Sequence, residues 1–133
     1  MTRIADLRKQ EQEQQKKTDA EIRKHQDALE GIRIQRRREE NKGLVGKCYR
    51  YKNCYSCPES EADYWWLYVK VLEIAPDGYV KAVLFQIDKE GMANVKHKLE
   101  SNMDGYEPIT KKKYERGLRE FLKHVYELVG ENP

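Results

Sequence analysis

A single stretch of 41 residues, from Thr2 to Lys42, contains no proline and only one glycine, Gly31. The stretch is dense in Glu, Gln, Lys, Arg and Ala, which lose little conformational entropy in a helix. It carries 12 Lys and Arg residues and 9 Asp and Glu residues, so most of its surface must be solvated. We therefore expect residues 1–42 to form one long, charged helix, and the folded domain to lie beyond it.

The composition of the whole chain agrees with this division. Of the 133 residues, 38% are hydrophobic and 37% are charged, and the mean hydropathy is −1.00. Compact domains contain about half hydrophobic and about a quarter charged residues, so part of the chain lies outside a core. Residues 43–109 carry 8 basic and 10 acidic side chains. Because nucleic-acid-binding domains are usually strongly basic, binding to a phosphate backbone is not the first expectation.

The long helix shows a heptad-like pattern, in which the positions that would face a partner helix recur at alternating steps of three and four residues. We call these positions the seam. One additional four-residue step, a stutter, lies between Thr18 and Ile22. The seam consists of Ile4, Leu7, Glu11, Gln14, Thr18, Ile22, His25, Leu29 and Ile32. A lone charged helix is one interpretation. We favour a dimerising or partner-docking coiled coil, because a helix this long needs packing to persist. The predicted oligomerisation residues are Ile4, Leu7, Ile22, Leu29 and Ile32.

Three consecutive arginines, Arg36, Arg37 and Arg38, follow this seam. Guanidinium groups bind phosphates or acidic protein surfaces, so all three are candidate partner-binding residues. Cations in the last turn also complement the helix dipole. The second interpretation is the simpler one, because Glu39 and Glu40 follow directly.

Residues 43–109 predict a small antiparallel β domain, since they alternate β-forming segments with Gly- and Pro-containing turns. The predicted strands are Leu44–Tyr55, Tyr64–Ile74, Tyr79–Asp88, Met92–Leu99 and Tyr106–Ile109. Four or five short strands at this spacing indicate a strongly bent sheet or a small SH3-like barrel.

Residues 110–130 predict a C-terminal amphipathic helix, with Thr110 as N-cap and Gly130 just after its end. Its apolar stripe consists of Tyr114, Leu118, Phe121, Leu122, Val125, Leu128 and Val129. We expect this helix to pack on the sheet and complete a thin core; a second exposed docking helix is the alternative. The predicted fold class is therefore α+β.

The three cysteines, Cys48, Cys54 and Cys57, have the spacing C-x5-C-x2-C. A zinc site needs four ligands, and the histidines are distant in sequence, so we expect no metal. An odd cysteine count, together with an N-terminus that lacks the apolar segment of a secretory signal, indicates reduced thiols and a cytoplasmic protein. The chain contains no apolar run long enough to span a membrane.

Seven of the thirteen aromatic residues lie between Tyr49 and Tyr68. The predicted partner-binding aromatics are Tyr49, Tyr51, Tyr64, Trp66 and Tyr68, although such rings could instead fill a small core. Adjacent Trp65 and Trp66 must point to opposite faces of their strand. Trp65 shares its parity with Leu67 and Val69, which favours Trp65 as the core residue.

The sequence contains no GxSxG, HExxH or Gly-rich phosphate loop. We therefore expect neither catalysis nor a cofactor. A basic patch at Lys96, His97 and Lys98 is the weaker candidate for a nucleotide site.

Part of the segment Leu44–Tyr68 resembles a segment found in small accessory proteins of bacteriophages and prophages, with the pattern GKxYxYxNxYSCP, an acidic loop, and DYWW. The matching residues are Gly46, Lys47, Tyr49, Tyr51, Asn53, Tyr55, Ser56, Cys57, Pro58, Asp63, Tyr64, Trp65 and Trp66. The resemblance implies a phage-type protein acting in a host bacterial cytoplasm, and it assigns no activity.

Small phage proteins of this type often bind and block host machinery, such as CRISPR effectors. We therefore expect a non-catalytic, homodimeric interaction protein that inhibits or modulates a host protein or protein–nucleic acid complex. One alternative is a nucleic-acid-binding accessory protein that uses Arg36–Arg38 and Lys111–Lys113. Another is a nucleotide-binding sponge or enzyme that uses the tyrosine cluster and Lys96–Lys98.

Overall fold

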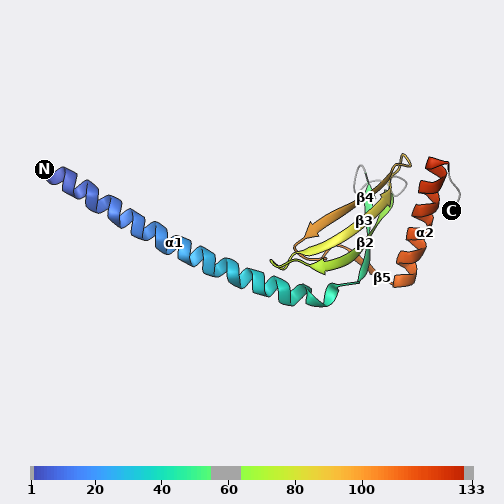
Figure 1. The fold of residues 1–133 in the computed structure, drawn as a ribbon, viewed down its shortest axis with the longest axis horizontal. Helices are drawn as coiled ribbons and strands as arrows, with labels where there is room; N and C mark the ends of the chain where they lie inside the picture. The colour runs from blue at the N-terminus through green and yellow to red at the C-terminus, as the bar shows by residue number, and fades with distance from the viewer. Residues whose placement is uncertain (1, 55–63, 131–133) are drawn as a thin grey trace. The chain divides into compact units, whose positions relative to one another are not determined.

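The computed structural model describes residues 2–54 and 64–130. It contains a long helix, α1 (Arg3–Asn41), a short 3-10 helix (Lys42–Leu44), five strands and a C-terminal helix, α2 (Lys111–Val129). The strands are β1 (Cys48–Cys54), β2 (Tyr64–Ile74), β3 (Val80–Ile87), β4 (Ala93–Glu100) and β5 (Glu107–Ile109). The predicted α+β class is confirmed, with its long N-terminal helix, antiparallel strands and C-terminal helix (Figure 1).

The chain divides into two compact units, residues 1–36 and 37–133. The first consists of α1 up to Arg36, and the helix continues unbroken through the stutter between Thr18 and Ile22. Apart from half-buried Ile34, the described side chains here are exposed, and local bonds such as Gln15 Nε2 to Asp19 Oδ1 (2.9 Å) link successive turns. A polar sequence of good helix formers accounts for this exposed helix.

The second unit includes the last turn of α1, so the boundary lies inside the helix rather than after Lys42. Asn41 is only 2% exposed, and its Nδ2 donates to the carbonyl oxygens of Gly78 (2.9 Å) and Ser101 (3.0 Å). These bonds satisfy the amide nitrogen of a buried side chain. They attach the last turn of α1 to the loops that follow β2 and β4.

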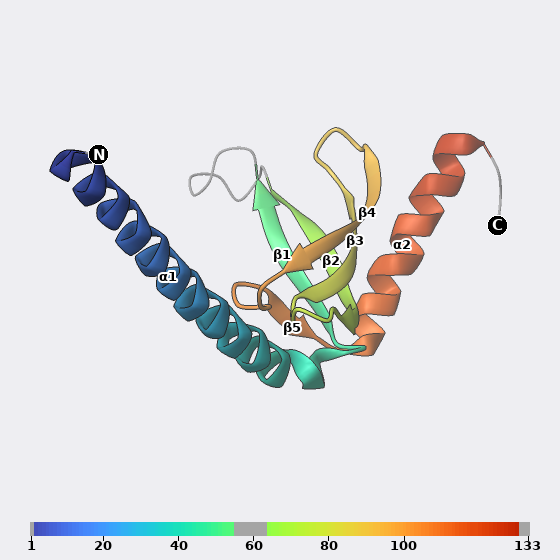
Figure 2. The same cartoon turned by 60° about the vertical axis from the view of Figure 1, so that its left-hand side comes forward.

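The five strands form one antiparallel sheet in the order β4-β3-β2-β1-β5. Figure 2 shows its strong twist. Among the described residues, β4 pairs with β3 alone and the three-residue β5 pairs with β1 alone, so the sheet is open. Of the two predicted forms, a strongly bent sheet or a small barrel, the closed barrel is not formed. The first strand begins at Cys48 rather than at Leu44, since a 3-10 helix and a turn at Gly46 (φ 84°) come first.

The main core lies on the sheet face that points away from α2. It consists of Tyr49, Leu67, Val69, Val71, Val80, Ala82, Leu84 and Met103. Successive residues of a strand alternate between faces, so the pleat of β1, β2 and β3 places the strand residues of this core on one face. Met103 joins them from the segment between β4 and β5.

The second core lies between α2 and the opposite face, and it confirms that the C-terminal helix packs on the sheet. Phe85 of β3 meets the rings of Tyr114 and Phe121 at centroid distances of 5.5 and 5.0 Å. The helix begins as predicted, with the Thr110 hydroxyl accepting from the backbone N–H of Lys113 (3.1 Å). It ends at Gly130, whose φ of 76° suits glycine.

Candidate functional site

Four side chains of β1 and β2 interlock on the face that carries α2. We call Arg50, Lys52, Tyr64 and Trp66 the cation–aromatic ladder. The antiparallel register pairs Lys52 with Trp66, so side chains of alternate residues on both strands share this face. The guanidinium of Arg50 lies 3.9 Å from the ring centroid of Trp66, and the ammonium of Lys52 lies 4.0 Å from that of Tyr64. The two rings meet edge to face at 5.8 Å.

Glu107 of β5 holds the ladder from its other side. Arg50 donates from Nε to Glu107 Oε2 (2.6 Å) and from Nη2 to Oε1 (3.1 Å), a bidentate pair. These bonds lower the pKa of Glu107 and raise the pKa of Arg50, because each charged form stabilises the other. The guanidinium is thus fixed between a carboxylate and an indole ring. The result is a pre-organised surface of rings and cations.

The predicted aromatic residues do not form one surface. Trp66 and Tyr64 lie on the ladder, whereas Tyr51 is exposed on the opposite face, beside Tyr106 (5.7 Å between ring centroids). Tyr49, another predicted partner-binding residue, is only 7% exposed and packs within the main core rather than on the surface. Its strand parity places it against aliphatic residues rather than solvent.

The remaining two central aromatics are mainly structural. Tyr68 is half-buried and stacks on Phe85 beneath α2, with the ring centroids 5.2 Å apart. Trp65 packs against the main core, and its indole N–H donates to Gln86 Oε1 (2.7 Å). The prediction that Trp65, rather than Trp66, faces the main core is confirmed.

Two residues of the arginine cluster, Arg37 and Arg38, form contacts with other residues of the same chain. Arg37 donates to the carbonyl oxygen of Asp77 (2.7 Å) and lies over the ring of Tyr79 (4.2 Å), and Arg38 donates to the carbonyl oxygen of Pro76. Arg37 and Arg38 therefore hold the β2–β3 turn against the last turn of α1. Sequence reasoning did not anticipate this role, because the acceptors are backbone carbonyls about forty residues away in sequence.

A polar groove of about 420 Å³ lies on the main-core face, and we call it the core-face groove. Its lining includes Tyr51, Asn53, Gln86, Lys96, Lys98 and Tyr106. Lys98 Nζ lies 3.1 Å from the hydroxyl of Tyr106, and that hydroxyl donates to Glu100 Oε1 (3.0 Å). Burial raises the pKa of Tyr106, and the bond to Glu100 raises the pKa of Lys98. Tyr106 was not singled out from sequence, since it follows a turn with no distinctive pattern around it.

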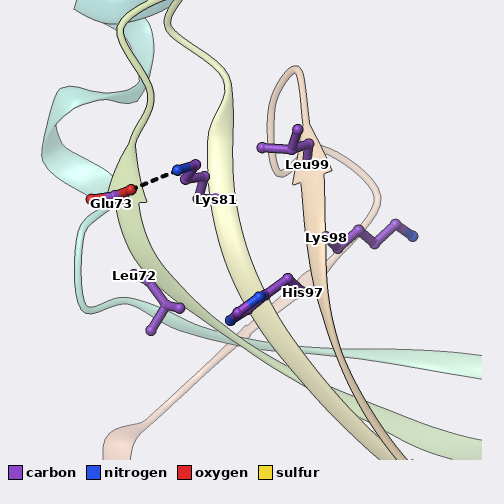
Figure 3. Close-up of a pocket in the computed structure, with 6 residues that line it drawn as sticks. All are labelled: Leu72, Glu73, Lys81, His97, Lys98 and Leu99. Carbon is purple, nitrogen blue, oxygen red and sulfur yellow. Dashed lines mark ion pairs between the residues drawn. The ribbon is translucent and has the colours of Figure 1, made fainter.

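A more apolar groove of about 640 Å³ lies where β2, β3 and β4 run side by side (Figure 3). Leu72 and Leu99 line it with exposed side chains, and Glu73 pairs with Lys81 at 3.0 Å. Figure 3 shows His97 turned toward Leu72 and Lys98 turned away. The residues of the predicted Lys96–Lys98 patch therefore do not share one site. Lys96 and Lys98 line the core-face groove, whereas His97 lines the apolar groove, which Lys98 also borders.

The cysteines differ from one another. Cys48 is a buried free thiol whose pKa is raised by burial. Cys54 is disulfide-bonded, so the expectation of reduced thiols is wrong for that residue. Cys57 lies outside the described residues, as do Tyr55, Ser56, Pro58 and Asp63 of the phage-like segment. Within residues 2–54 and 64–130, no three His, Cys, Asp or Glu side chains are grouped to hold a metal ion.

None of the described helices has the length and apolar character needed to cross a membrane. We compared the chain with protein-family models, with curated proteins and with solved structures. None of the three comparisons finds a match.

Proposed function

We propose that this chain is a non-catalytic interaction protein of bacteriophage type. In this proposal the cation–aromatic ladder docks on a host bacterial protein, or on a protein–nucleic acid complex, and inhibits or modulates it in the host cytoplasm. The phage origin and the host target rest on the resemblance of the segment around Tyr49 to Trp66 described above. The ladder itself supports binding rather than chemistry.

The observation that carries the proposal is the interlocked geometry of the ladder. Trp, Tyr and Arg are the residue types that contribute most binding energy in protein interfaces. Here Trp66 and Arg50 are already stacked at 3.9 Å, and Glu107 fixes the guanidinium from its other side. Side chains held in place before binding lose little conformational entropy when a partner docks.

Two finer features of the fold belong to the same proposal. We regard the β unit as SH3-like, and its support is the order of the strands, in which β5 returns to pair with β1 after the meander of β1 to β4. We regard α1 as a coiled-coil helix in a homodimer. Its support is the exposed apolar stripe that includes Ile22, Leu29 and Ile32.

The test is capture of partners from bacterial lysate by the intact chain, followed by binding measurements with the purified partner. We expect Trp66→Ala to weaken binding by about 30-fold, which corresponds to about 2 kcal/mol. Leu99→Ala is the matched control, because Leu99 is an exposed apolar residue outside the ladder. Equal affinities of the Trp66→Ala and Leu99→Ala chains would remove the ladder from the proposal.

One observation favours a second candidate function, the binding of a nucleotide. The core-face groove brings Tyr51 together with Lys96 and Lys98, which are far apart in sequence. A ring for stacking and cations for phosphate are the groups that such a ligand needs. Native mass spectrometry of the intact chain with nucleoside monophosphates tests this candidate, and Tyr51→Ala should abolish any adduct formed there.

A further inference from the structure

The spacing of the seam positions in α1 is the same in both directions from Thr18. Pairs of seam residues lie 4, 7, 11 and 14 positions on either side of it. These pairs are Gln14 with Ile22, Glu11 with His25, Leu7 with Leu29, and Ile4 with Ile32. The four-residue steps on both sides of Thr18 are what create this symmetry.

The structure shows that the whole seam lies on one continuous helix. α1 runs unbroken from Arg3 to Asn41. At about 100° per residue, the nine seam positions fall within an arc of about 80°. The five apolar side chains among them are between 47% and 62% exposed, so nothing among the described residues covers the stripe.

We propose that α1 pairs with α1 of a second copy in antiparallel orientation, with Thr18 on the two-fold axis. This inference rests on the homodimer of the proposed function and specifies its geometry. Ile4 then meets Ile32 of the second copy, and Leu7 meets Leu29, so apolar layers close both ends of the paired region. Such isologous pairing is the commonest symmetry of homodimers.

The charges select this orientation over the parallel one. In the antiparallel pair, Glu11 lies opposite His25 of the second copy, and Lys17 lies beside Glu21 of the second copy. In a parallel, in-register pair, Glu11 would face Glu11 of the second copy, and Arg3 would lie beside Arg8 of the second copy. Like charges across a coiled coil disfavour the parallel arrangement. In the antiparallel one, Glu11 no longer faces a like charge, and Lys17 and Glu21 form an opposite-charge pair.

The arrangement has a functional consequence. The second compact unit begins at Arg37, 19 residues beyond Thr18. At 1.5 Å per residue, the two Arg37 positions of the dimer would lie about 57 Å apart along the axis. The dimer would carry two cation–aromatic ladders, one on each copy, which suits a partner with repeated sites and raises its apparent affinity through bivalent binding.

Oxidative cross-linking of full-length chains tests the orientation. Three variants are needed, Leu7→Cys, Leu29→Cys and Thr18→Cys, with the unsubstituted chain as the control for the native cysteines. Thr18→Cys should cross-link in either orientation and shows that dimers are present. A mixture of the Leu7→Cys and Leu29→Cys chains should give the mixed cross-linked dimer, while Leu7→Cys alone should give none. Light scattering before oxidation shows whether each variant remains dimeric.

Cross-linking of Leu7→Cys with itself would overturn the antiparallel arrangement, and so would a monomeric unsubstituted chain. A charge exchange gives an independent readout that does not alter the apolar layers. Glu11→Lys should weaken the dimer, and Glu11→Lys combined with His25→Glu should restore it. Failure of the combined variant to restore dimerisation counts against the proposal. None of these results depends on partner binding at Trp66, so a failure here is distinguishable from a failure of the proposed function.

Discussion

Gly117 of α2 lies directly against the ring of Tyr68 in β2. A Cβ atom at position 117 would come within 2.7 Å of two ring atoms of Tyr68. The ring has little freedom to move away, because it is stacked on Phe85. The missing side chain therefore allows α2 to approach the sheet closely enough to cover the second core.

This contact predicts the effect of Gly117→Ala. Alanine favours a helix by about 1 kcal/mol relative to glycine, but the clash with Tyr68 should outweigh that gain and lower the free energy of unfolding by about 1–3 kcal/mol. Urea unfolding followed by circular dichroism measures the change. The control is Gly31→Ala, at another helical glycine with no atom within 4 Å of the added Cβ, and it should leave the β unit as stable as before. A Gly117→Ala chain as stable as the original would show that the helix can shift.

The adjacent tryptophans should respond differently to truncation. Trp65→Ala removes a ring from the main core and a hydrogen bond to Gln86, so we expect a loss of about 3–5 kcal/mol of stability. Trp66→Ala removes a ring from the ladder, and the fold should lose clearly less. Chemical denaturation of both variants provides the comparison. Equal losses would mean that both rings act as core, and the binding surface would then have no support.

Gly78 should be harder to replace than Gly105. Both have a positive φ, 87° and 88°, so alanine is strained at either position. Only at Gly78 would the added Cβ also meet other atoms, at 2.8 Å from Arg37 Cβ and from the Arg38 backbone nitrogen. We expect Gly78→Ala to lower the thermal midpoint more than Gly105→Ala does. Similar midpoints would argue that the last turn of α1 is not held tightly against this turn.

The ion pair between Glu107 and Arg50 should weaken at acidic pH, when Glu107 becomes protonated. Because Arg50 lowers the pKa of this carboxyl below its usual value of 4.5, the charged pair favours the folded state above that value. This contribution is lost as the pH falls through the lowered pKa. Carboxyl NMR titration should give a Glu107 midpoint below 4.5, and Arg50→Gln should move it upward. An unchanged midpoint in the Arg50→Gln chain would contradict the pairing in solution.

Self-association should depend on the apolar side of α1. Light scattering should give a dimer mass for the full chain at tens of micromolar. Leu29→Asp places a charge on the exposed stripe and should shift the mass toward the monomer. Arg23→Asp changes a residue of the same helix outside the seam and should leave the mass unchanged. A chain that is monomeric without any substitution would remove the coiled coil from the proposal.

Local patterns in the sequence predicted the elements well, and the reason is physical. The 3.6-residue period of residues 110–130 and the turn residues between the strands act within a few residues of one another. The N-cap at Thr110 and the positive φ at Gly130 followed from the same local chemistry. Strand alternation was also sufficient to place Trp65 and Trp66 on opposite faces.

The candidate site was only partly accessible to such reasoning. Trp66 and Tyr64 were predicted as binding residues, and both lie on the ladder. Arg50 was not predicted as a binding residue, because its role depends on Glu107, which is 57 residues away. Tyr49 has the same residue type as Tyr51 and lies two positions earlier, yet only the latter is exposed.

The sequence by itself therefore determined which segments are helices, which are strands, and which side chains share a face, because these properties depend on neighbouring residues. Only the tertiary structure decided which face of each strand meets α2, which tyrosine is buried, and which cation stacks on which ring. It also decided that the sheet stays open, with β4 and β5 as its two edges. Such outcomes depend on contacts between residues distant in the chain, and a local pattern contains no information about which of several equivalent partners will be brought close.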